Sequence, residues 1–242
     1  MPSAAAQRDI PSDMVYLPPA LPSAWGEGAI LPVDKPEGRP SFDVVSAVRG
    51  GTGVSKVGHA GTLDPIATGL LIMLVARPAT RLQEACVQLP KTYEATLRLG
   101  ETTPSYDTET DVTSRADPSG LSRSDLEDTC ASFAGPINQV PPMYSAVKVD
   151  GERLYKKARR GETVERLPRQ VRIDRIELRD WTPPELSLRV ECSKGTYIRA
   201  LARDLGEKLG VGGHLTALRR TAIGPFSVGE SWTLAALTDA LA

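Results

Sequence analysis

The sequence predicts an α+β fold with a mixed, mostly antiparallel sheet flanked by helices. Two segments, 91–99 and 186–192, alternate between apolar and polar residues, which is the period of a half-buried strand. Segment 198–209 instead repeats its apolar residues at helical spacing, and Gly210 follows as a typical helix terminator. Strands and helices follow one another without a regular βαβ rhythm, and this favours antiparallel strand pairs.

Shorter signals place further elements. Segment 30–33 is a short apolar strand, and Ser41 is expected to cap a helix that stops at the glycine pair 50–51. Another helix is expected to start at Ser122 or Ser124. The inward residues are Phe42, Val45 and Val48 in the first helix, and Leu126 and Phe133 in the second.

Composition and charge are those of an ordinary globular protein. The chain has 242 residues, of which 40% are hydrophobic and 24% charged, and its net charge is −1. The charge is unevenly spread, because Lys148 to Arg175 holds ten basic residues against five acidic ones. Such a stretch indicates either a footprint for a polyanion or a solvated arginine-rich face.

Several classes of protein are disfavoured. The three cysteines lie far apart and the two histidines have no partner at metal-ligand spacing, so neither a disulfide framework nor a metal site is predicted. The longest apolar run, 69–76, is too short to cross a membrane. The N-terminal segment lacks a signal-peptide core, so we expect a cytoplasmic protein.

The chain is expected to hold one large domain. Residues 1–28 are rich in proline, alanine and serine without sustained periodicity, which predicts a poorly ordered extension. The domain then spans residues 29–242.

One loop, residues 58–71, combines glycines with a single carboxylate, Asp64. Glycines let a backbone turn sharply, and Pro65 stiffens the turn that presents the acid. An Asp-Pro turn without function is one reading of this pattern. A phosphate-binding loop is disfavoured because segment 53–58 lacks the required Gly-Lys-Ser or Gly-Lys-Thr, and a glycosidase pair lacks a second comparably constrained acid.

The loop Gly58-His59-Ala60-Gly61-Thr62-Leu63-Asp64-Pro65-Ile66-Ala67-Thr68-Gly69-Leu70-Leu71 resembles the active-site loop of the TruB family of bacterial tRNA pseudouridine-55 synthases. Five further blocks match that family in order, and together they cover roughly residues 30 to 230. They are Asp34-Lys35-Pro36, Lys91-Thr92-Tyr93-Glu94-Ala95, Pro141-Pro142-Met143-Tyr144-Ser145-Ala146-Val147-Lys148, Ser193-Lys194-Gly195-Thr196-Tyr197-Ile198-Arg199-Ala200 and Leu218-Arg219-Arg220.

The resemblance implies a pseudouridine-synthase fold and the isomerisation of uridine 55 in the T loop of tRNA. It makes Asp64 the catalytic acid and Arg199 the cation that pairs with it. Tyr93 would stack on the flipped uracil, Leu218 would form an apolar wall, and Tyr197 would support the pocket floor or simply pack. No metal or cofactor is implied, and the protein would act as a monomer without an obligate protein partner.

The resemblance also implies an RNA interface. An inserted thumb at about residues 137–167 would grip the phosphate backbone. Lys35 would reach a phosphate or support the loop, and His59 would meet the RNA around the vacated base. The chain ends before the PUA domain that many relatives carry, so affinity for the acceptor-stem end of tRNA is expected to differ. The RNA-binding residues implied are Lys35, His59, Lys148, Arg153, Lys156, Lys157, Arg159 and Arg160.

Two other functions fit the same residues. One is a tRNA-folding chaperone of the same fold, and the other is the catalytic subunit of a guide-RNA-dependent pseudouridylase. Catalysis on bare tRNA by the purified protein distinguishes the standalone enzyme from both.

Overall fold

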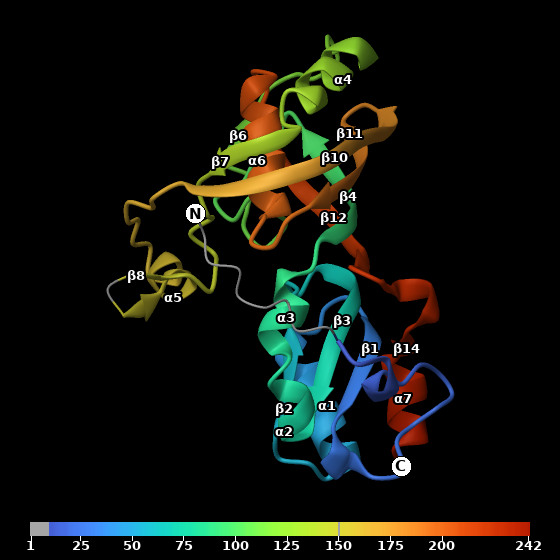
Figure 1. Ribbon diagram of the computed structural model, residues 1–242. Coiled ribbons are helices and arrows are strands. Elements are labelled where there is room, and N and C mark those ends of the chain that lie inside the picture. Colours follow the sequence, from blue (N-terminus) through green and yellow to red (C-terminus); the bar gives the residue numbers. More distant parts are fainter. Residues whose placement is uncertain (1–9, 150) are drawn as a thin grey trace, which may run out of the picture. The chain divides into compact units, whose positions relative to one another are not determined.

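A computed structural model describes residues 10–149 and 151–242 (Figure 1). The chain divides into two compact units, one built from residues up to Thr92 together with Arg219–Ala242, the other from Tyr93–Leu218. Strands β4 (Lys91–Leu99) and β12 (Gly213–Ile223) contribute residues to both units. Each unit combines a mostly antiparallel sheet with helices, which confirms the predicted fold class.

In the first unit the strand order is β14-β1-β3-β12, with β2 paired to β3 and β13 paired to β12. Strand β1 runs parallel to β14 and antiparallel to β3, so the sheet is mixed. The elements of this unit are η1 (Ser12–Met14), η2 (Trp25–Glu27), β1 (Ala29–Lys35), α1 (Ser41–Thr52), β2 (Val57–Ala60), β3 (Ala67–Val75), α2 (Ala76–Thr80), α3 (Gln83–Gln88), β13 (Phe226–Ser227), η3 (Val228–Glu230), β14 (Trp232–Thr233) and α7 (Leu234–Ala240).

This sheet buries a core on each of its faces. Odd-numbered residues of β1 and β3 pack with α1 and α7, while even-numbered ones pack with α2 and α3. Alternate residues of a strand point to opposite faces, so a strand covered on both sides is apolar throughout. The apolar run at 69–76 is therefore a buried strand, and its length reflects two cores rather than a membrane.

Helix α1 begins at Ser41 as predicted, but Ser41 does not cap it. The N-cap position is Pro40, and the Ser41 hydroxyl instead bonds the backbone of Leu63. The prediction for Phe42 is also wrong, because this side chain is 62% exposed. The buried face follows the i, i+3, i+4, i+7 pattern from residue 41, which leaves residue 42 outside the stripe. The buried residues are Ser41, Val44, Val45 and Val48.

Residues 10–28 belong to the first unit. Val15 forms a parallel bridge with Ile30, and the Tyr16 carbonyl accepts a hydrogen bond of 3.2 Å from the Trp232 indole. Trp25 packs partly buried against the core. Residues 1–9, the other part of the predicted extension, lie outside the described residues.

The second unit has the strand order β12-β4-β11-β10-β7. Burial alternates along β4 and β11, which confirms both predicted strands. Ser122 caps α4 in a capping box with Asp125, whereas Phe133 lies beyond the helix end. The remaining elements are β5 (Glu101–Thr102), β6 (Ser114–Arg115), α4 (Arg123–Ala131), β7 (Gly135–Gln139), β8 (Lys148–Val149), β9 (Glu152–Arg153), α5 (Leu154–Arg159), β10 (Arg169–Thr182), β11 (Glu185–Cys192) and α6 (Ile198–Lys208).

All three cysteines are free thiols in the interior. Burial raises the pKa of the Cys86 and Cys130 thiols to about 11. Among the helices of the described residues, none has the length and apolar character that a membrane crossing requires.

We predict that Gly69→Ala strongly destabilises the protein. Gly69 has a φ of +98°, and a Cβ placed there would lie 2.3 Å from the carbonyl oxygen and 2.8 Å from the amide nitrogen of Arg220. Backbone atoms of a neighbouring strand have little room to yield, so the free energy of unfolding should fall by about 3 kcal/mol or more in urea denaturation.

Gly50→Ala is the matched control. Gly50 lies inside α1, and a Cβ there meets nothing within 4 Å. Helix propensity alone predicts a gain of about 0.5–1 kcal/mol. Equal effects of the two substitutions would contradict the close approach of β3 and β12.

Candidate active site

Asp64 lies in the loop between β2 and β3 of the first unit, as the glycine pattern predicted. Its side chain is half-buried, and its carbonyl oxygen accepts a hydrogen bond of 3.1 Å from the Ala67 amide. Gly61, three residues earlier, has a φ of +83°, a conformation that favours glycine. The loop thus combines one tight turn with one half-exposed acid.

Side chains from three other elements hold the peptides of this loop. The Ser41 hydroxyl donates to the Leu63 carbonyl at 3.0 Å and accepts from the Leu63 amide at 2.9 Å. Arg220 on β12 donates through Nη2 to the Gly61 carbonyl at 2.8 Å. The Pro65 carbonyl accepts from the Gly38 amide at 2.8 Å and from Lys35 Nζ at 3.4 Å. The backbone on both sides of Asp64 is therefore fixed by specific partners.

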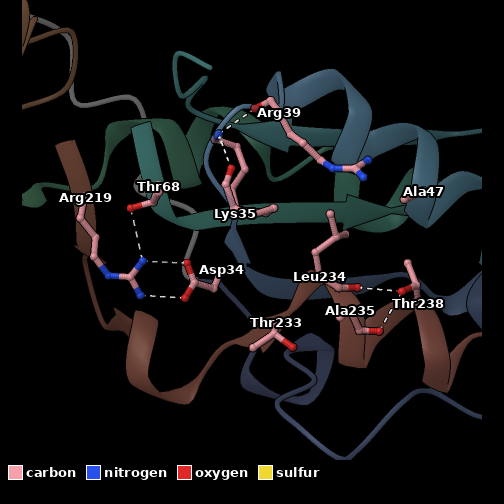
Figure 2. A pocket seen from close by; sticks show the side chains of 11 residues that line it. Asp34, Lys35, Arg39, Ala47, Thr68, Arg219, Thr233, Leu234, Ala235 and Thr238 are labelled. Carbon is pink, nitrogen blue, oxygen red and sulfur yellow. Dashed lines mark hydrogen bonds and ion pairs between the residues drawn. The ribbon is translucent and has the colours of Figure 1, made fainter. Parts of the chain in front are cut away.

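Lys35 is a buried cation beside this loop. Its ammonium donates to the carbonyls of Pro36 at 2.8 Å and Arg39 at 2.7 Å (Figure 2). It also donates to the Pro65 carbonyl, as given above. Burial lowers the pKa of Lys35 to about 8, while the nearby Asp64 charge raises it. The side chain is thus still mostly an ammonium at neutral pH. These contacts are those of a lysine that supports a loop, and its contact with RNA stays a prediction.

A half-open cavity of about 570 Å³ borders Lys35. Figure 2 shows Arg219 at its edge, where the guanidinium donates to both carboxylate oxygens of Asp34 at 3.1 and 2.7 Å and to the Thr68 hydroxyl at 3.4 Å. Arg219 and Arg220 are neighbours on β12 with different roles. Arg219 closes an ion pair at a cavity, whereas Arg220 is buried and bonds backbone carbonyls.

Arg220 also acts on His59. The Arg220 side chain is 1% exposed, and its Nε donates to the Leu70 carbonyl at 2.6 Å. His59 lies on β2, half-buried, with its backbone carbonyl bonded by Gln83. Burial, and secondly the Arg220 charge, lower the pKa of His59. The imidazole is therefore neutral at neutral pH, and its contact with RNA stays a prediction.

Arg199 of the second unit is buried rather than solvent-exposed, with 4% of its surface accessible. Nη2 donates to the Tyr144 carbonyl at 2.8 Å and Nη1 to the Ser105 carbonyl at 3.2 Å. Nη1 also lies 3.3 Å from Oδ2 of the buried Asp107. Sequence reasoning missed Asp107, because nothing in its local pattern distinguishes it from the other acids between residues 101 and 135.

The other expected pocket residues also lie in the second unit. Tyr93 and Leu218 are both 8% exposed. Tyr197 precedes α6, and the side-chain amide of Gln139 bonds both of its backbone groups. The Tyr197 N–H donates to Gln139 Oε1 at 2.8 Å, and Gln139 Nε2 donates to the Tyr197 carbonyl at 3.0 Å. Gln139 is 2% exposed and was not predicted. It fixes the backbone directly before α6, the helix whose first turn carries Arg199.

The basic residues of the thumb, defined above as about residues 137–167, fall into two groups. Arg160 donates to both oxygens of Glu152 at 2.8 Å and to Glu162 at 2.6 Å. Arg159 lies 3.3 Å from Glu109. These two guanidinium groups are engaged with acids, and Lys157 is half-buried. A second group, called the exposed group, consists of Lys148, Arg153 and Lys156; Arg159 and Arg160 are also exposed but lie against acids, and Arg166 donates to the Pro141 carbonyl at 3.2 Å.

Within residues 10–149 and 151–242, no cluster of three or more His, Cys, Asp or Glu side chains could hold a metal ion.

Comparison with known proteins gives two family matches. Residues 49–198 match the model described as TruB family pseudouridylate synthase, N-terminal domain. Residues 199–242 match that of the tRNA pseudouridylate synthase B C-terminal domain.

Curated relatives and solved structures agree with these matches. tRNA pseudouridine synthase B of Mycobacterium sp. strain KMS is 50% identical over 88% of this chain and 72% of the relative. The synthase of Opitutus terrae is 45% identical over 86% of each chain. A Cbf5-Nop10-Gar1 complex has a chain that superposes with a TM-score of 0.70 at 29% identity, over 96% of this chain and 60% of that one.

A related solved structure is an H/ACA RNP bound to a substrate RNA containing 2′-deoxyuridine. It superposes with a TM-score of 0.66 at 29% identity, over 88% of this chain. This chain spans about half the length of that one, 53%.

We predict that Asp64→Asn lowers the pKa of Lys35 below its wild-type value of about 8. The substitution removes the negative charge that favours the ammonium, while the burial that opposes it is unchanged. The titration of the Lys35 Cε resonance by NMR measures this pKa, and Lys35→Met assigns the resonance. A midpoint that stays the same in Asp64→Asn would mean that the two charges do not interact.

Proposed function

The chain belongs to the TruB family of pseudouridine synthases, and we propose that it isomerises uridine 55 in the T loop of tRNA with Asp64 as the catalytic acid. The observation that carries the proposal is the loop itself. Asp64 lies inside the matched residues 49–198, in the loop that resembles the family's active-site loop, and the peptides around it are held by Ser41, Lys35 and Arg220.

The reaction breaks the C–N glycosidic bond, turns the uracil while it is bound, and rejoins it to the ribose through carbon 5. Carbon 5 loses a proton and the released ring nitrogen gains one, so substrate and product are isomers. A carboxylate drives this chemistry only if it stays ionised when the base excludes water. Lys35 supplies a positive charge close enough to Asp64 for each to affect the other. Extrusion of the base from the RNA stack costs a few kcal/mol, which contacts in the site must offset.

The family resemblance assigns further residues to the reaction. Tyr93 stacks on the flipped uracil, a contact worth about 1–3 kcal/mol, and Leu218 forms an apolar wall. By the same resemblance Arg199 is the cation that pairs with the catalytic acid, and within the second unit Asp107 and two backbone carbonyls orient its guanidinium. Tyr197 and Gln139 fix the backbone from which Arg199 extends.

The thumb supplies the attraction for the RNA backbone. Lys148, Arg153 and Lys156 are exposed and suited to phosphate contacts, whereas Arg160 is engaged with Glu152 and Glu162. We assign the phosphate contacts chiefly to the exposed group. The enzyme acts in this proposal as a cytoplasmic monomer on tRNA, without an obligate protein partner.

We expect Asp64→Asn to abolish turnover, by about 10⁴-fold or more, with tRNA binding retained. Tritium release from tRNA labelled at carbon 5 of uridine measures the chemistry, because rejoining through that carbon expels the label. The control substrate has cytidine in place of uridine 55 and should release nothing from the T loop. Turnover by the Asn variant would remove Asp64 from the mechanism.

The same assay separates the other functions. Release from bare tRNA by the purified wild type supports the standalone enzyme. Binding of tRNA without release favours the chaperone, and release that requires an added guide RNA or added proteins favours the guide-dependent enzyme.

We further expect the double substitution Lys148→Ala/Lys156→Ala to weaken tRNA binding and its salt dependence. Each lost phosphate contact should reduce the slope of log K against log salt by about 0.7–0.9. The control is Arg123→Ala on α4, which removes an exposed charge already paired with Glu127. An unchanged slope in the thumb variant would exclude both lysines from the interface.

A further inference from the structure

We infer that Ser41 is a positioning residue for Asp64, an inference that rests on the proposed function. Its hydroxyl is the link between helix α1 and the residue that precedes the acid. Ser41 is 3% exposed and Leu63 is 3% exposed, so water does not compete for these hydrogen bonds.

The bridge uses both capacities of a hydroxyl. The oxygen accepts from the Leu63 amide at 2.9 Å while the proton goes to the Leu63 carbonyl at 3.0 Å. One side chain thereby satisfies both polar groups of a single buried peptide residue. Both backbone torsions of Leu63, φ and ψ, are constrained as a result. The ψ of Leu63 sets the orientation of the next residue, Asp64, and so the direction of its side chain.

The position of Ser41 explains why its hydroxyl is available for this task. A serine at a helix start ordinarily caps its own helix. Here Pro40 occupies the N-cap without a side-chain bond, so that Ser41 enters the first turn with its hydroxyl directed at the loop. Helix α1 therefore has no side-chain cap at its start, and the hydroxyl is free to bond Leu63 of the loop.

The other fixed points of the loop leave this role to Ser41. Arg220 holds Gly61, three residues before the acid, and Lys35 holds Pro65, which follows it. Neither bonds Leu63. Without the hydroxyl, the residue directly before Asp64 would have a buried amide and a buried carbonyl to satisfy by moving.

We expect Ser41→Ala to lower kcat on tRNA by about tenfold, with KM within about twofold of the wild type, because a small misplacement of a reacting group affects the chemical step and not binding. Ser41→Cys keeps the volume but hydrogen-bonds weakly and should behave like Ser41→Ala. Ser41→Thr keeps the hydroxyl and should restore most of kcat. Ser46→Ala is the matched control, since Ser46 lies on the exposed side of the same helix and donates to the Phe42 carbonyl of that helix.

Amide hydrogen exchange of Leu63 gives a second readout that needs no activity. It should accelerate in the Ala and Cys variants and be unchanged in Ser46→Ala. A wild-type enzyme that is active and an Ala variant with full kcat would overturn the inference, even if the melting temperature falls. An inactive wild type would overturn the proposed function instead. In that case, an unaltered Leu63 exchange rate in Ser41→Ala would overturn the inference about Ser41 independently.

Discussion

The buried peptide groups of the loop that carries Asp64 have to be hydrogen-bonded, and much of the first unit serves that requirement. Each unsatisfied buried amide or carbonyl costs about 1–3 kcal/mol. The partners come from β1, from the start of α1 and from β12, where Arg220 lies 159 positions after Gly61 in the chain. Loops usually obtain such partners from water. A loop that obtains them from side chains is held in one conformation, and an acid on it needs no reorganisation before it reacts.

The buried positive charges of the first unit are also held by backbone groups of the protein. Lys35 and Arg220 are both buried, and both donate hydrogen bonds to backbone carbonyl oxygens, with the Asp64 and Glu37 charges near Lys35. A buried cation is costly unless its protons are all engaged, and backbone carbonyls engage them without cancelling the charge. The result is a positive potential built into the scaffold beside the acid. In the second unit, Arg199 is instead compensated in part by Asp107, so its charge is closer to neutralised.

The sequence predicts this molecule well where the information is local. The alternation of 91–99 and 186–192, the Ser122 capping box and the helical spacing after residue 198 each specify an element by periodicity or by a short motif. A glycine-rich turn and a proline distinguish Asp64 from the other acids, while its catalytic role follows from the family resemblance and stays a prediction.

Long-range contacts were the part that could not be predicted. Ser41 has the pattern of an N-cap, and only the tertiary structure reveals that its hydroxyl bonds a residue 22 positions later. Arg220 is one of two adjacent arginines, and the pleat of β12 decides which of them is buried. Asp107 and Gln139 carry no local mark, because their partners, Arg199 and Tyr197, lie more than fifty residues away in the chain.

The three buried thiols make the protein a convenient object for spectroscopy. With a pKa of about 11 and no access to solvent, Cys86 and Cys130 stay protonated at neutral pH and react slowly with maleimides, and Cys192 is equally buried. A cysteine introduced on the exposed side of the thumb would therefore take up a dye or a spin label selectively. A label there can thus report whether an added RNA binds this segment, without first removing any native cysteine.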